Sequence, residues 1–225
     1  MEWLVAVLVA GGGGVAVLRR LSGRRTQRQA DAEELAGVQA MADEDVTLLG
    51  EQLQRLGADQ AGAMDEATRL DYQTALDAYE SAKRAVPRLR SAEEVSTVVD
   101  TLSAGRYALA CMTARLAGRP VPELRVPCFF NPQHGPSVRD VRWTQPGRGT
   151  RTVPACSQDA VRVTNGELPE IRQVRVGAHL APYWEAGDAY LPYGRNYFSS
   201  AVLEAGYRAQ AQAPGGFGSL GSGGQ

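Results

Sequence analysis

The sequence predicts a mainly α-helical protein that ends in a small α+β module. Two patterns support this prediction. Apolar residues recur at helical spacing from residue 41 to 118, and after Gly118 this periodicity is replaced by clustered prolines and short alternating runs. A third pattern, an apolar run at the N-terminus, predicts a transmembrane helix ahead of both. Apolar residues make up 44% of the 225, which is enough for a buried core.

These patterns divide the chain into five segments. The predicted boundaries are residues 1–20 for a transmembrane anchor, 21–40 for a basic collar and polar helical stalk, 41–118 for a helical bundle, 119–198 for the α+β module, and 199–225 for a disordered tail rich in Gly, Ala and Gln. Charge follows a similar division. Residues 31–100 hold sixteen acidic and six basic side chains, whereas residues 101–198 hold seven acidic and twelve basic ones.

The first segment predicts a single membrane span. Trp3 to Leu18 is a run without charge that would measure about 24 Å as a helix, a little short of the roughly 30 Å hydrocarbon layer. The arginines that follow it can reach the interface by snorkelling. A cleaved signal peptide is the alternative, but it would carry its positive charge before the apolar run, where this chain has Glu2.

A basic collar follows the predicted span. Positive residues stay on the cytoplasmic side, so we expect the N-terminus outside and the body in the cytoplasm of a membrane-bound protein. The same side chains are the candidate residues for contact with anionic lipid headgroups. They are Arg19, Arg20, Arg24, Arg25 and Arg28.

The acidic middle of the chain predicts a helical hairpin or an antiparallel three-helix bundle. A first helix is expected to begin at the acidic run 43–45 and to end at Gly57, with an apolar stripe at Val46, Leu49, Leu53 and Leu56. A second helix over 71–86 would end at Pro87.

A third helix is predicted from a capping box, in which Ser91 and Glu94 satisfy each other's backbone donors. Its apolar stripe is broken once, at Gly105, and the helix ends before Gly118 and Pro120. The stripe consists of Val95, Val98, Leu102, Leu109, Met112 and Leu116.

The C-terminal module predicts short antiparallel strands with one helix between them. We expect strands over 138–143 and 150–153 around a turn at 146–149, a helix over 157–164, and strands over 171–176 and 179–182 joined at Gly177.

The module also carries the residues that suggest chemistry, namely Cys128, His134, Cys156 and His179. Three interpretations stay open. Zinc accepts two thiolates and two imidazoles, although the spacing lacks the close pairs of ordinary zinc modules. A Cys128–Cys156 disulfide would require an oxidising compartment. The third interpretation is two buried thiols, a histidine that caps a turn, and a surface His179.

Several function classes are disfavoured. The net charge of −1 and the acidic residues between the arginines argue against nucleic acid as a partner. The chain lacks Gly-x-Ser-x-Gly, a P-loop and a dinucleotide fingerprint. The lack of any histidine before His134 argues against a di-iron bundle. A nucleophilic pair of Cys128 and His134 lacks a visible orienting group.

The sequence resembles an actinobacterial family of membrane-anchored proteins over roughly residues 40–198. The resemblance is carried by Pro127-Cys-Phe-Phe-Asn-Pro-Gln-His-Gly-Pro136, by Val153-Pro-Ala-Cys156 and by Pro182-Tyr-Trp-Glu-Ala-Gly187. In some relatives this region follows a TPM-type domain and a membrane span, whereas this chain starts at the span. The resemblance implies a membrane anchor with a cytoplasmic body, and it implies no reaction.

We therefore expect a single-pass membrane-anchored interaction or scaffold protein without a cofactor. Its partners would be the lipid bilayer and an unidentified membrane or cytoplasmic protein, and self-association through the helices is a further option. The alternative is a metal- or thiol-dependent enzyme, hydrolase-like, built on the loops of Cys128, His134 and Cys156, with zinc as the metal.

Overall fold

The computed structural model describes residues 3–60, 64–145, 147 and 149–194, with the side chains of residues 1–27 and 58–63 outside the description. The protein is mainly helical, with two small antiparallel sheets, as the sequence predicts. Its helices are α1 (Trp3–Gln60), α2 (Glu66–Ala85), α3 (Ala92–Leu116), α4 (Ser157–Thr164) and α5 (Leu191–Gly194). Its strands are β1 (Arg139–Gln145), β2 (Gly149–Ala155), β3 (Gln173–Val176) and β4 (His179–Pro182). Short 3-10 helices are η1 (Val86–Arg88), η2 (Pro132–His134), η3 (Tyr183–Glu185) and η4 (Asp188–Tyr190).

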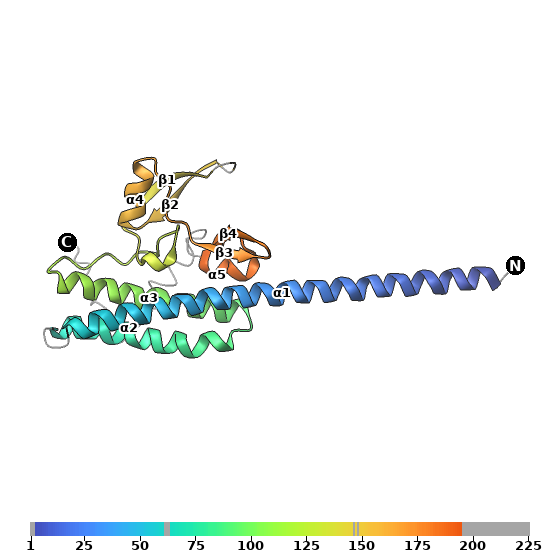
Figure 1. Cartoon of the computed structure of the whole chain (residues 1–225), viewed down its shortest axis with the longest axis horizontal. Coiled ribbons are helices and arrows are strands. Elements are labelled where there is room, and N and C mark those ends of the chain that lie inside the picture. The colour runs from blue at the N-terminus through green and yellow to red at the C-terminus, as the bar shows by residue number, and fades with distance from the viewer. Residues whose placement is uncertain (1–2, 61–63, 146, 148, 195–225) are drawn as a thin grey trace, which may run out of the picture.

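Helix α1 is a single continuous helix across the three N-terminal segments of the predicted division. Its C-terminal half lies beside α2 and α3, and its N-terminal half extends away from the rest of the protein (Figure 1). The expected helix start at residues 43–45 and the expected end at Gly57 are therefore both wrong. Asp45 lies inside the helix and is fully buried, so this carboxylate serves tertiary packing and not the helix dipole.

No helix in the described part of the chain is long and apolar enough to cross a membrane. The residues expected to form the anchor lie at the N-terminal end of α1, where the side chains are outside the description. The anchor consequently stays a prediction.

The ends of α2 and α3 follow local signals. Asp65 caps α2 by accepting a hydrogen bond from the Thr68 amide, and Pro87 follows at the end of the helix. The predicted capping box of α3 is confirmed, because Ser91 accepts from the Glu94 amide and Glu94 accepts from the Ser91 amide.

Gly105 does not interrupt α3. A Cβ atom at this position would come within 2.8 Å of Ala78 Cβ and 3.1 Å of Leu49 Cδ2. The glycine therefore marks the place where all three helices approach closely, and the break expected in the apolar stripe is a contact site.

The C-terminal half forms two separate hairpins. Strands β1 and β2 pair from Arg139↔Ala155 to Gln145↔Gly149, and β3 pairs with β4 from Gln173↔Pro182 to Val176↔His179. Helix α4 follows β2 over the range that the sequence predicts. The two hairpins lie on the same side of the helices (Figure 1).

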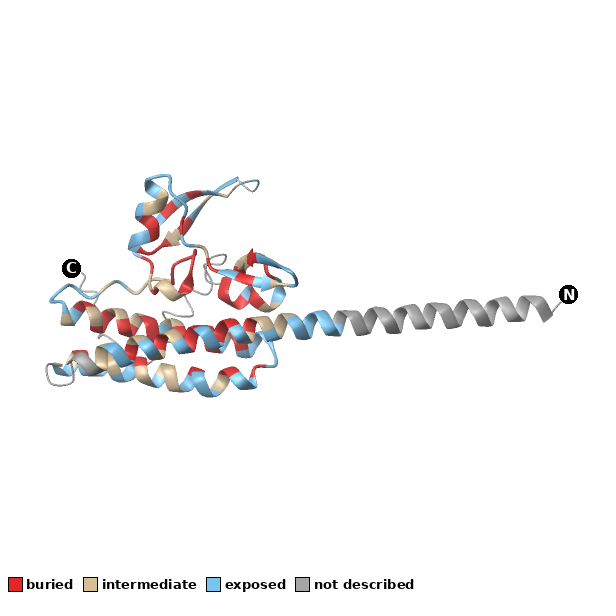
Figure 2. Ribbon diagram, in the orientation of Figure 1, coloured by how far each residue is buried: buried red, intermediate tan, exposed pale blue. Residues whose placement is uncertain are grey.

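Two hydrophobic cores result, and they divide the chain differently from the sequence-based segments. The helical core combines the stripes of α1, α2 and α3 with Val174, Tyr183, Ala186, Tyr190 and Tyr193 of the second hairpin region. The small core lies between β1, β2, α4 and the loop before β1 (Figure 2). It consists of Cys128, Phe129, Phe130, Val141, Trp143, Val153, Ala155, Cys156 and Ala160. Trp184 packs against both cores and joins them.

Candidate metal centre

The loop at residues 127–136 supplies two of the chemically active side chains. It is closed by an antiparallel bridge between Pro127 and Pro136 and by a 3.0 Å hydrogen bond from the Cys128 amide to the Gly135 carbonyl. Within it, the Asn131 side chain accepts from the Gln133 amide at the start of η2. This closure brings Cys128 and His134 close together although they are six positions apart in the chain.

The junction of β2 and α4 supplies the other two side chains. Cys156 is the N-cap of α4, and its Sγ accepts a hydrogen bond from the Asp159 amide at 3.4 Å. A cap at this position is normally Ser, Thr, Asp or Asn, so a cysteine here is uncommon. Because Asp159 lies in the first turn of α4, its carboxylate turns back toward Cys156.

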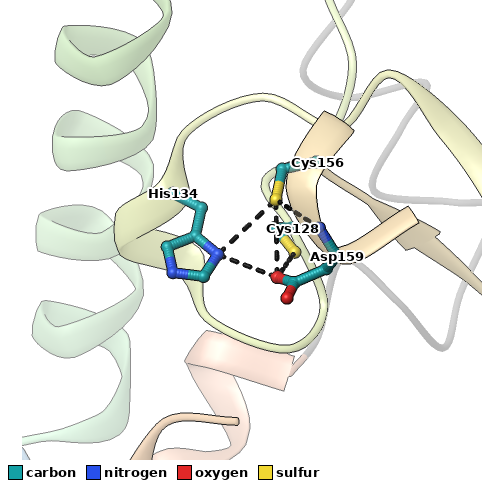
Figure 3. A group of neighbouring side chains, drawn as sticks. All are labelled: Cys128, His134, Cys156 and Asp159. Carbon is teal, nitrogen blue, oxygen red and sulfur yellow. Dashed lines mark hydrogen bonds and ion pairs between the residues drawn. The ribbon is translucent and has the colours of Figure 1, made fainter. Parts of the chain in front are cut away.

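The four side chains converge on a common point (Figure 3). Asp159 Oδ2 lies 3.3 Å from Cys128 Sγ, 3.4 Å from Cys156 Sγ and 2.9 Å from His134 Nδ1. His134 Nδ1 is 3.6 Å from Cys156 Sγ, and all four ligand atoms lie within 4.8 Å of one another.

These distances match the edges of a metal tetrahedron. Zinc binds sulfur at about 2.3 Å and nitrogen or oxygen at about 2.0 Å, so neighbouring ligand atoms of a tetrahedral site lie about 3.3–3.8 Å apart. The measured separations of 2.9–3.6 Å between the four contacting pairs are close to this range. The donor set could therefore hold a small cation that accepts thiolate, imidazole and carboxylate.

The surroundings hold each ligand in this orientation. Asp159 Oδ1, which faces away from the thiols, accepts from the Glu170 amide at 2.9 Å and from Arg162 Nη1 at 3.3 Å. His134 Nε2 lies 3.5 Å from Glu170 Oε1, so a carboxylate faces the ring nitrogen that points away from the cluster. Such outer contacts orient the ligands of metal sites in proteins.

Burial of the cluster is nearly complete. Cys128 and Asp159 are fully buried, Cys156 is 7% exposed, and the His134 side chain is 16% exposed. A carboxylate buried with two thiols is unfavourable unless cations or hydrogen bonds compensate it.

The groups also shift one another's pKa. A hydrogen bond with Cys128 lowers the pKa of Cys156 to about 5, although burial opposes this change. The same hydrogen bond, followed by burial, raises the pKa of the Cys128 thiol. Burial lowers the pKa of His134, but Cys156 and then Asp159 outweigh it and raise the pKa to about 9. Both shifts favour the charged forms, the Cys156 thiolate and the His134 imidazolium.

The structure brings together three of the four residues predicted from the sequence. Cys128, His134 and Cys156 belong to the cluster, and within the described residues no cysteine forms a disulfide. His179 does not join them, because it lies exposed at the start of β4 in the other hairpin. Its place is taken by Asp159, which the sequence analysis missed. The available signal was the spacing Cys156-x-x-Asp159, a close ligand pair in which a carboxylate replaces the second thiol.

The basic collar is only partly described. Arg28 is exposed on α1, and the other four arginines of the collar lie among the residues whose side chains are outside the description. Contact of this collar with lipid stays a prediction.

Comparisons with protein-family models, with curated proteins and with solved structures find no match to this chain. The resemblance carried by the Cys128-Phe-Phe and Pro182-Tyr-Trp motifs therefore stays a prediction. Conclusions about function rest on the geometry of the site.

Proposed function

We propose that this protein is a zinc-binding module, with one zinc ion held by Cys128, His134, Cys156 and Asp159. The observation that carries the proposal is the convergence of these four ligand atoms within 4.8 Å from two separate segments of the chain. Two thiolates, one imidazole and one carboxylate suit zinc better than the hard cations calcium and magnesium, which prefer oxygen ligands.

The role of the zinc ion is structural. Four protein ligands complete a tetrahedral site and leave no position for a substrate or a reactive water. Two thiolates and a carboxylate around a divalent cation carry a net charge of −1. Arg162 lies beside Asp159 Oδ1 and is shared with Glu170, so the surroundings of the site remain negative and favour a cation.

The small core supports the same role. It has nine buried residues, of which two are the proposed ligands Cys128 and Cys156. A core of this size rarely stabilises a fold without a disulfide or a metal. Zinc would cross-link the loop at 127–136 to the β2–α4 junction, which are the two segments that enclose the core.

The direct test is metal analysis of the full chain purified without chelator. We expect one zinc per chain and, after exchange for Co2+, the visible absorption of a tetrahedral thiolate complex. Cys156→Ser should lower zinc affinity at least tenfold, because a serine keeps the cap of α4 but removes the thiolate. Cys128→Ala should have at least as large an effect.

Two matched controls separate this site from the other candidates. Cys111→Ser changes the buried cysteine of α3, and His179→Ala changes the histidine that lies outside the cluster. Both variants should retain one zinc per chain. A wild-type chain that binds neither Zn2+ nor Co2+ stoichiometrically would refute the proposal.

A second candidate function is thiol chemistry at Cys156. The observation that favours it is the pKa of about 5, with His134 Nδ1 at 3.6 Å. In a nucleophilic pair the orienting group contacts the other ring nitrogen, as Glu170 Oε1 does here at 3.5 Å from His134 Nε2, but Asp159 also competes with Cys156 for Nδ1. Rapid alkylation of Cys156 in the metal-loaded chain would favour this candidate over a closed zinc site.

The wider role that we propose is an interaction or scaffold module tethered to a membrane by the N-terminal end of α1. The apolar run from Trp3 to Leu18 and the arginine collar support the tether, with the body on the cytoplasmic side. Since all three native cysteines are buried, the test needs a reporter such as Glu93→Cys on the exposed side of α3. An impermeant thiol reagent should label it only after the cells are opened, and labelling of intact cells would contradict this orientation.

A further inference from the structure

Asp45 is a buried charged residue at the place where the helices meet the C-terminal half. Its Oδ1 lies 3.2 Å from Arg106 Nη2 of α3 and also accepts from Arg172 Nη1, and its Oδ2 accepts from the Tyr193 hydroxyl at 2.9 Å. One further donor is Gln133 Nε2, at 2.8 Å from Oδ1. The carboxylate of α1 therefore joins α3, α5 and the loop of the zinc site.

Gln133 links Asp45 closely to the proposed zinc ligand His134. It precedes His134 within η2, so the loop presents one side chain to the zinc ligands and the next to α1. The peptide unit that links the two residues is fixed further by the hydrogen bond from the His134 amide to the Asn131 carbonyl. A change in the position of His134 cannot leave Gln133 in place.

The rest of the loop is tied to the same junction. The Tyr183 hydroxyl donates to the Phe129 carbonyl at 2.8 Å, and the Arg172 amide donates to the Phe130 carbonyl at 2.9 Å. The Arg172 guanidinium also bonds the Met41 carbonyl of α1. Phe129 and Phe130 thus belong to the small core by their side chains and to the junction by their backbone carbonyls.

We infer that zinc binding and docking of the small core onto α1 are coupled, with the Gln133–Asp45 contact as the latch. The inference rests on the proposed zinc site and adds its regulation. Zinc orders the loop that carries Cys128 and His134, and the ordered loop holds Gln133 against Asp45. Coupling between two sites is reciprocal. If loss of zinc lowers the equilibrium constant for docking by some factor, loss of the Asp45 contact must lower the affinity for zinc by the same factor.

The test measures zinc affinity by competition with a chelating indicator in the full chain. Asp45 lies 88 residues before Gln133 in the chain, and Asp45→Asn changes none of the proposed zinc ligands. The variant should nevertheless lower zinc affinity about tenfold. Gln133→Ala should give a similar loss, and the loss in the double variant should be smaller than the sum of the two single losses, because Asp45→Asn weakens the contact that Gln133→Ala removes. Gln133→Ala also serves where Asp45→Asn is too unstable to purify.

Tyr193→Phe and Leu102→Ala are the controls. The first removes the hydrogen bond to the other oxygen of Asp45, and the second weakens the helical core at a residue that lies outside the latch. Both variants should bind zinc with an affinity within about twofold of wild type. Added zinc should raise the melting temperature of the helices in wild type and raise it less in Gln133→Ala.

The outcomes separate the two proposals. If wild type binds one zinc and both Asp45→Asn and Gln133→Ala bind it equally tightly, the latch is refuted and the zinc site stands. If wild type binds no zinc, the proposed function fails and the latch fails with it. If Leu102→Ala weakens zinc binding as much as Asp45→Asn, general destabilisation replaces the latch as the explanation.

Discussion

The two cores of this protein are stabilised in different ways. The helical core draws on apolar stripes that repeat along three long helices, so many interchangeable contacts contribute to it. The small core has nine buried residues from one loop, two strands and a short helix, and it contains a buried carboxylate and two thiols. The comparison teaches that the first core is stabilised mainly by periodic apolar burial, whereas we expect the second to depend on a few specific polar interactions.

Removal of zinc should separate the two cores most strongly. In the zinc-loaded chain of a Trp3→Phe variant, tryptophan fluorescence reports Trp143 and Trp184 alone. We expect this fluorescence and far-UV circular dichroism to show one thermal transition. After chelation the fluorescence transition should fall at least about 10 °C below the helical one, since 1 kcal/mol shifts the melting temperature of a small domain by about 4–8 °C. Coincident transitions after chelation would contradict the proposed difference between the cores, because the small core would then be stable without metal.

The junction between the cores should be the most sensitive single position for overall stability. Asp45→Asn removes the negative charge between Arg106 and Arg172, both of which are buried. Breaking a buried ion pair from one side costs about 3–5 kcal/mol, because the remaining charges stay desolvated. Urea denaturation measures this loss, with Asp43→Asn on the exposed side of α1 as the control. Equal urea denaturation midpoints for the two variants would show that the ion pairs of Asp45 do not contribute to stability.

The apolar stripe of α3 should give the next effect. Leu102 is fully buried in the helical core, so Leu102→Ala should cost about 2–5 kcal/mol. Leu109, at 8% exposure, belongs to the same stripe and should show a loss in this range, whereas Glu93→Ala on the exposed face should change stability by less than about 0.5 kcal/mol. Chemical denaturation of the full chain by circular dichroism distinguishes them, and similar losses for Leu102→Ala and Glu93→Ala would refute the assignment of the stripe.

The smallest predicted effect concerns a local signal of the helical core. Ser91→Ala removes the hydroxyl that caps α3 and should destabilise the helical transition by about 1 kcal/mol. Zinc affinity should not change, because Ser91 contacts neither the small core nor the latch. A measurable loss of zinc binding in this variant would mean that the two cores unfold as one unit.

The same contrast explains what could be predicted from the sequence. The stripe of α3, its capping box and the range of α4 follow from local patterns of three to four residues, and the structure confirms them. The start of α1 was predicted wrongly, because an acidic run that typically begins a helix here supplies a buried ion pair. That role depends on Arg172, which lies 127 residues away, and no local pattern reports it.

The candidate site was predicted only in part, and the reason is similar. The two cysteines and His134 were recognisable as ligand types, but His179 was grouped with them because its residue type fits zinc. The backbone decides otherwise, since the bridge of Pro127 and Pro136 and the cap of α4 determine which side chains meet. Asp159 is a common surface residue type, and only its position three residues after Cys156 distinguishes it.

Helix α1 has a mechanical consequence for the whole protein. A continuous helix rises about 1.5 Å and turns by about 100° per residue, so its 58 residues form a torsional rod about 87 Å long. One residue inserted between Arg28 and Glu33 would displace the body by only about 1.5 Å but would swing it about 100° around the rod. Seven inserted residues would displace it by about 10 Å and nearly restore its heading. The angular register of α1 thus sets the direction that the side of the body with the proposed zinc site faces.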